Sequence, residues 1–139
     1  MPSTIATALA ATFKDYPASA LVGGKLEVLS QERFTLASDA VASYAIGPII
    51  PVGAVPLLGI ITTTVSLGSS TIAIGIAGTT GKYRAAAAFT TADTPTLFGN
   101  AVVLGVALTA AKQLLLSVAA AALPASGTLH IALLGRRNG

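Results

Sequence analysis

Apolar and polar residues alternate with period two along several short stretches of the chain, which is the pattern of half-buried β-strands. The alternating stretches are 25–29, 33–36, 70–76 and 128–134. Residues 57–67 (LLGIITTTVSL) add a run rich in β-branched side chains, which favour strands. Gly68-Ser69 separates this run from the next alternating stretch, and a two-residue break of this kind predicts a hairpin. The pattern therefore predicts five strands.

The remaining segments have less regular patterns. Residues 45–56 carry three prolines and two glycines, and they predict a loop or an edge segment because proline is confined to edges, strand starts and bulges. Residues 85–91 predict a strand of small residues that ends before the turn signal at 93–95 (Asp-Thr-Pro). Residues 106–123 are rich in helix formers but lack a 3.6-residue period. We expect a strand over 113–121, although a helix over 106–123 stays open.

Short strands at about ten-residue spacing, separated by Gly/Pro turns, indicate an all-β protein with a sandwich, jelly roll or barrel. We divide the chain into an N-terminal arm, residues 1–22, and a β-sandwich domain, residues 23–139. The arm is rich in Ala, Thr and Ser and is closed by a glycine pair at 23–24. It fits a short amphipathic helix over 5–13 and equally an extended segment lying on a neighbouring subunit.

A run of 42 residues, Ala40–Gly81, carries no charged side chain. Such a run can be a membrane span, a buried core or a surface that a partner covers. Three prolines at 48, 51 and 56 exclude a spanning helix there, because each costs a helix about 3 kcal/mol. The second apolar stretch, 101–125, has Lys112 near its middle, which costs about 2.5–3.5 kcal/mol at a bilayer centre. We therefore expect no membrane partner.

The chain as a whole has little charge. Only 9% of residues are charged and 53% are hydrophobic, whereas surfaces of soluble monomers need about 25–35% charged residues. Apolar surface in a soluble protein most often marks a partner interface, so oligomerisation or incorporation into an assembly is expected. The net charge of +3 comes from scattered basic residues, and only Lys82-Tyr83-Arg84 interleaves an aromatic with them. A solvated loop tip explains these three residues better, so no nucleic-acid partner is expected. The chain contains no cysteine, which excludes disulfides.

Groups that carry catalysis are sparse and do not form a known arrangement. The glycine-rich stretch 75–83 (GIAGTTGKY) fails the P-loop pattern, because its glycine spacing is wrong and Tyr83 follows Lys82 where Ser or Thr is needed. A hairpin or strand-connecting loop explains it better. The one histidine, His130, lies in an alternating strand with no second histidine or cysteine for a metal site. None of the five carboxylates forms a suggestive pair, and we predict no enzyme activity, no metal and no cofactor.

Several short motifs resemble a group of small virion proteins of tailed bacteriophages. They are the turn 50–54 (IPVGA), the strand 70–75 (STIAIG), the segment 82–87 (KYRAAA), the continuation 89–99 (FTTADTPTLFG) and the ending 123–129 (LPASGTL). The resemblance covers roughly residues 47–134. One departure is Gly78–Gly81, where an acidic loop is expected before Lys82, so a loop-borne ion or charge role does not carry over.

The resemblance implies a head decoration (cement) protein with a jelly-roll-like antiparallel β-sandwich and an extended N-terminal arm. It implies the major capsid protein as partner, a location on the phage head surface after assembly in the host cytoplasm, and a homo-oligomer, a trimer or otherwise a dimer. A head-fibre or tail-spike base or a receptor-binding module is the alternative. We place intersubunit contacts in the arm, in 45–56 and in the Lys-Tyr-Arg cluster. The candidate contact residues are Phe13, Tyr16, Ile49, Ile50, Val52, Val55, Lys82, Tyr83 and Arg84.

Overall fold

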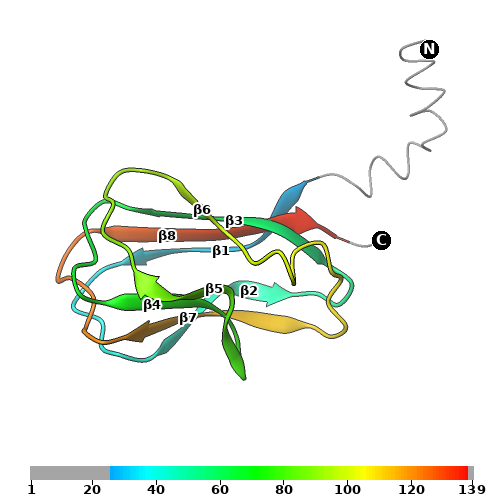
Figure 1. Ribbon diagram of the computed structural model, residues 1–139, viewed down its shortest axis with the longest axis horizontal. Helices are drawn as coiled ribbons and strands as arrows, with labels where there is room; N and C mark the ends of the chain where they lie inside the picture. The colour runs from blue at the N-terminus through cyan, green and yellow to red at the C-terminus, as the bar shows by residue number, and fades with distance from the viewer. Residues whose placement is uncertain (1–25, 138–139) are drawn as a thin grey trace, which may run out of the picture.

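Two four-stranded antiparallel sheets pack face to face in the computed structural model, which describes residues 26–137 (Figure 1). Their order is β1-β8-β3-β6 in one sheet and β2-β7-β4-β5 in the other. The strands are β1 (Glu27–Thr35), β2 (Ser43–Ile50), β3 (Val55–Thr63), β4 (Thr71–Ile76), β5 (Thr79–Ala88), β6 (Thr96–Phe98), β7 (Lys112–Ala119) and β8 (Thr128–Arg136). Within residues 26–137 no helix has the length and apolar character to cross a membrane.

The strand pairings are nested like one long hairpin that has been rolled up. β1 pairs with β8, β2 with β7, β3 with β6 and β4 with β5, and the tip is the two-residue turn at 77–78, where Gly78 has a φ of +84°. Rolling brings β8 against β3 and β7 against β4, which completes the two sheets. This arrangement is the eight-stranded jelly roll, so the expected all-β sandwich fold is confirmed.

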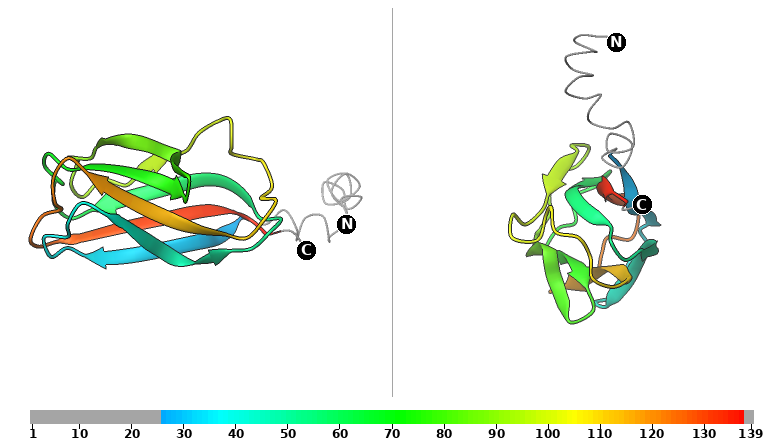
Figure 2. Two further views of the ribbon diagram at one scale, coloured as in Figure 1. Left: turned by 90° about the horizontal axis from the view of Figure 1, so that it is seen from below. Right: turned by 90° about the vertical axis from the view of Figure 1, so that its right-hand side faces the viewer.

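The core lies between the inner faces of the two sheets. Alternate residues of β7 are buried (Leu114, Leu116 and Val118), and so are alternate residues of β8 (Leu129, Ile131 and Leu133), as expected where each strand turns one face inward. Each such side chain contributes about 1.5–3 kcal/mol when fully buried. The strands run along the long axis of the molecule, so the connecting loops gather at two opposite ends (Figure 2).

Several expectations about individual segments are confirmed. Residues 57–63 of the expected run 57–67 belong to β3, and the stretches 70–76 and 128–134 correspond to β4 and β8. The expected strand over 113–121 is β7, and 106–111 form a loop rather than a helix. Residues 45–50 belong to β2, an edge strand whose register is irregular around Pro48, and 51–54 form a turn.

Other expectations were wrong. Gly68-Ser69 does not join a hairpin, because β3 and β4 belong to different sheets and residues 64–70 cross between them. The buried Leu67 anchors this crossing, and its N–H donates to the Phe89 carbonyl. The two alternating stretches 25–29 and 33–36 are parts of one strand, β1, which has an irregularity between Val28 and Ser30. Residues 79–81, expected in a loop, begin β5, and β6 was not predicted.

Candidate interaction surface

The two long sides of the sandwich differ, because one is closed by hydrogen bonds between the sheets. On the side of β1 and β2, the buried Ser30 hydroxyl donates to the carbonyls of Ile46 (2.8 Å) and Pro48 (3.2 Å). The Gly47 N–H donates to the Glu32 carboxylate at 3.1 Å. These bonds join the edge strands of the two sheets.

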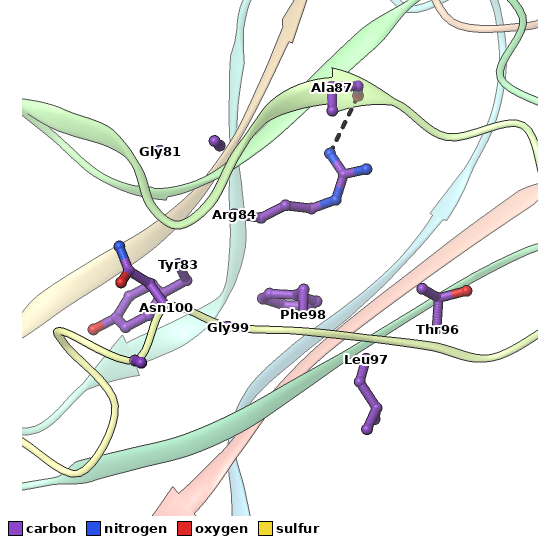
Figure 3. A pocket seen from close by; sticks show the side chains of 11 residues that line it. Gly81, Tyr83, Arg84, Ala87, Thr96, Leu97, Phe98, Gly99 and Asn100 are labelled. Atoms are coloured by element: carbon purple, nitrogen blue, oxygen red, sulfur yellow. Dashed lines mark hydrogen bonds between the residues drawn. The ribbon is translucent and has the colours of Figure 1, made fainter.

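The opposite side, between β5 and β6, holds a cavity of about 520 Å³. Its walls come from β5 and from residues 96–101, and Figure 3 shows Phe98 between the two. The Phe98 ring lies over Gly59, where an added Cβ would come within 2.2 Å of the ring. Phe98 therefore packs a short edge strand onto the rest of its sheet.

β5 bulges away from β4, and the Arg84 side chain fills the resulting space. Its guanidinium donates to the carbonyls of Ile72, Ala87 (3.2 Å) and Ala88 (3.2 Å), and the bond to Ala87 is drawn in Figure 3. Burial lowers the pKa of Arg84 from its ordinary value. Its hydrogen bonds thus give Arg84 a structural role within β5.

Exposed valines gather at the end of the sandwich where β1 begins and β8 ends, on the right in Figure 1. Val52 lies in the 51–54 turn, and Val102 and Val106 lie in the 99–111 loop, 80% and 56% exposed. We call these three residues the valine surface. The two loops are joined by hydrogen bonds from Gly53 N–H to the Leu108 carbonyl and from Leu108 N–H to the Ala54 carbonyl. Leu108 is buried, so the core holds the loop that carries Val102 and Val106 in place.

A second cavity, of about 190 Å³, opens between the 99–111 loop and the first half of β5. Valines 102, 103 and 106 form its apolar wall, and Lys82 and Lys112 contribute the two charged side chains that line it. The Lys82 amino group lies 5.7 Å from the centre of the Tyr83 ring, within cation–π range. This end of the molecule therefore combines apolar side chains with positive charge.

The structure divides the candidate contact residues into three groups. Ile49 and Val52 are exposed and Lys82 is partly exposed, so all three can reach a partner. Ile50, Val55 and Tyr83 are buried in the core and offer no contact surface, and Arg84 donates to carbonyls of β4 and of its own strand β5. Phe13 and Tyr16 lie outside the described residues.

Sequence reasoning missed Val102 and Val106, which the structure shows to be among the most exposed apolar side chains. The sequence pattern places Val102 only within a possible membrane span over 101–125, and Val106 also at the start of a possible helix over 106–123. Gly105 lies between the two valines and has a φ of +84°, which a regular element does not accommodate. Apolar residues on both sides of a turn glycine were the available signal.

Among residues 26–137 no hydrogen bond or ion pair joins His130 to a carboxylate. The His130 ring contacts the Gln31 side-chain oxygen at 3.1 Å on the outer face of the β1-β8-β3-β6 sheet. Within residues 26–137 no group of three or more metal-ligating side chains occurs. The valine surface and its lysine-lined cavity are accordingly the features with a recognisable binding chemistry.

The fold defines the class of the chain as a small eight-stranded jelly roll. Solved structures share it: a chain of the cyanophage Pam1 capsid asymmetric unit matches with a TM-score of 0.64 and 21% identity, over 83% of this chain and 86% of that one. A chain of the capsid of Ralstonia phage GP4 matches with a TM-score of 0.59 and 19% identity, over 81% and 86%. No protein-family model matches, and no curated protein matches significantly.

Proposed function

We propose that this protein is a capsid decoration protein, which attaches to the head of a tailed phage and bridges neighbouring capsid subunits. The observation that carries the proposal is the valine surface. It exposes three large apolar side chains on two anchored loops of a chain with only 9% charged residues. Exposed apolar surface of this kind most often marks a site that a partner covers, which is the situation of an assembly subunit.

The likeness to chains in two phage capsids supports this proposal. The aligned region exceeds four fifths of both chains in each comparison, so this chain and its structural neighbours are single jelly rolls of similar size. A protein of this size binds a capsid through the surface area that it buries against the capsid subunits. The major capsid protein is the proposed partner, and the virion head surface, reached from the host cytoplasm, is the proposed location.

We propose that the working unit is a symmetric homo-oligomer, a trimer with a dimer as the alternative. Closed rotational symmetry is the rule for soluble oligomers, and a decoration protein fits the symmetry axes of a capsid. The exposed Ile49, Val52 and Lys82 remain the contact residues proposed within the sandwich, joined now by Val102 and Val106. Phe13 and Tyr16 remain proposed contacts from the N-terminal arm.

The test is whether the purified protein binds heads built from the major capsid protein encoded in the same genome. Pelleting the heads through a sucrose cushion should bring the protein down at a fixed, saturable ratio. Light scattering on the protein alone should give the mass of a trimer or a dimer. A protein that stays monomeric and never pellets with heads would refute the proposal. Saturable binding to isolated fibres or tails, with none to heads, would instead support the fibre or spike alternative.

A further inference from the structure

The 190 Å³ cavity beside the valine surface has positive charge without a matching negative charge. Lys82 enters it from β5 and Lys112 from the start of β7, while its other walls are apolar or uncharged. Among residues 26–137 no carboxylate lines the cavity, and neither lysine forms an ion pair. An acidic group next to apolar side chains is the chemistry that complements such a site.

The chain has five carboxylates, and four of them are placed elsewhere. Glu27 pairs with Arg137, Glu32 accepts the Gly47 N–H, and Asp39 accepts the Ala37 N–H. Asp93 lies in the turn between β5 and β6, at the end of the sandwich away from the valine surface, where its N–H donates to the Thr63 carbonyl. The remaining carboxylate is Asp15, which lies outside the described residues.

Asp15 has two aromatic residues close to it in the sequence, which suits the valine surface. Phe13 lies two residues before it and Tyr16 directly after it, so the segment 13–16 supplies two aromatic rings and one carboxylate beside Lys14. No other carboxylate of the chain lies within two residues of two aromatic side chains.

The position of β1 brings this segment within reach. β1 begins at the valine end, where Glu27 pairs with Gly135 and Gly135 pairs with Pro56. Two strand spacings of about 4.8 Å separate Glu27 from Pro56, or roughly 10 Å. The Pro56 carbonyl in turn accepts the Gly105 N–H of the 99–111 loop. The eleven Cα–Cα steps from Asp15 to Leu26 span up to about 36–40 Å when extended, which is several times the distance of roughly 10 Å from Glu27 to Pro56.

We propose that residues 13–16 of this chain dock on the valine surface, with the Asp15 carboxylate between the Lys82 and Lys112 amino groups. Phe13 and Tyr16 then cover Val102 and Val106. The occupant is this segment of a neighbouring copy, so docking joins protomers of the homo-oligomer. The proposal concerns the protein alone and stands or falls independently of capsid binding.

Zero-length carbodiimide cross-linking tests the contact directly, because the reagent joins a carboxylate and an amine only when they touch. The full-length protein is cross-linked without heads, digested and analysed by mass spectrometry. An Asp15–Lys82 or Asp15–Lys112 link is expected, and Asp15→Asn should remove it. Asp93 is the matched control, since this exposed carboxylate at the opposite end should give no link to either lysine. A mixture of ¹⁴N- and ¹⁵N-labelled protein should give links between differently labelled peptides, and links confined to one chain would overturn docking between copies.

Tryptic cleavage after Lys14 gives a second readout that does not depend on cross-linking chemistry. Docking should protect this bond, and the double variant Lys82→Gln/Lys112→Gln should be cleaved about fivefold faster, because cleavage follows the population of the undocked segment. Both lysines are partly exposed, so the variant should keep the circular dichroism of the sandwich. Absence of both Asp15 links together with equal cleavage rates would overturn the proposal. So would links from these lysines only to carboxylates of an added capsid protein.

Discussion

Replacing the exposed valines with serine should weaken assembly while leaving the fold intact. Val102 and Val106 are 80% and 56% exposed in the protomer, so little of their area contributes to folding. Fully burying a valine stabilises by about 1.5 kcal/mol or more, up to about 3 kcal/mol. Scaled by the exposed fractions, covering the two side chains contributes about 1.2–2.4 and about 0.8–1.7 kcal/mol. The sum, about 2–4 kcal/mol, corresponds to roughly 30-fold to several hundred-fold in affinity.

Val41 provides a control of the same residue type. It is also 56% exposed, as Val106 is, but it lies in the loop between β1 and β2 at the opposite end of the sandwich. Val41→Ser therefore removes the same exposed apolar area from a surface that we do not expect to be covered. Any difference between Val41→Ser and Val106→Ser reports the location of the surface rather than the chemistry of the substitution.

Sedimentation equilibrium measures self-association, and head pelleting over a range of concentrations measures binding to the capsid. Val102→Ser/Val106→Ser should weaken at least one of the two associations by the factor above, and Val41→Ser should weaken neither. Urea unfolding of each variant should stay within about 0.5 kcal/mol of the parent protein, as is usual for surface positions. Equal affinities for the double variant and for Val41→Ser would refute the reasoning, because burial of the valine surface would then contribute nothing.

Three further predictions concern the stability of the sandwich, measured by urea unfolding. Ser30→Ala should lower the free energy of unfolding by about 0.5–1.5 kcal/mol. The loss should lie at the lower end of this range, because the Gln113 amide still donates to the Ile46 carbonyl. An unchanged free energy of unfolding would mean that the hydrogen bond between the sheets contributes nothing. Gly59→Ala should lower the free energy of unfolding by about 1–3 kcal/mol, because the added methyl group clashes with the Phe98 ring. The double variant with Phe98→Leu should lose less stability than the sum of the losses of the two single variants, and strict additivity would contradict the contact. Burial raises the pKa of the Tyr83 phenol above 10.0, so the unfolded chain loses this proton first and stability should fall as the pH rises through 10 toward the folded pKa. Tyr83→Phe should flatten that decline, and an unchanged pH profile would exclude Tyr83 as its source.

Local alternation predicted most strands because each sheet has one buried face. β7 shows how far this goes: its composition favours a helix, yet Leu114, Leu116 and Val118 alternate with less buried neighbours, which only a strand produces. The predicted hairpin at Gly68-Ser69 failed because turn residues do not reveal whether the chain reverses within a sheet or crosses to the other one. In a jelly roll the partner of β3 comes from β6 and β8, more than thirty residues away. Sequence spacing carries no signal for such pairings.

The candidate contact residues were harder to predict, because an apolar residue in this chain can be core or surface. Adjacent residues differ in their burial: Ile49 is exposed while Ile50 is buried, as the alternation of side chains along a strand requires. Tyr83 and Arg84 looked like a solvated basic and aromatic cluster, but the bulges of β5 turn Tyr83 into the core and Arg84 onto three carbonyls of its own sheet. A bulge shifts the alternation by an amount that only the paired strand reveals.

The uncharged run Ala40–Gly81 forms both core strands and an exposed turn, and its composition does not distinguish the two. It contains β2, β3 and β4, whose buried isoleucines fill the core, and it contains the 51–54 turn, where Val52 faces outward. Core strands need no charge on their inner faces, but an exposed turn in a monomer has no reason to lack it. Because that turn is bonded to the 99–111 loop, which exposes two more valines, the missing charge continues across two segments distant in sequence. Lys82 and Lys112 lie beside these loops, so this end is apolar with positive charge at its margin. Apolar loops joined in this way are typical of a surface that a partner covers, and the valine-to-serine comparison tests that account at its most exposed residues.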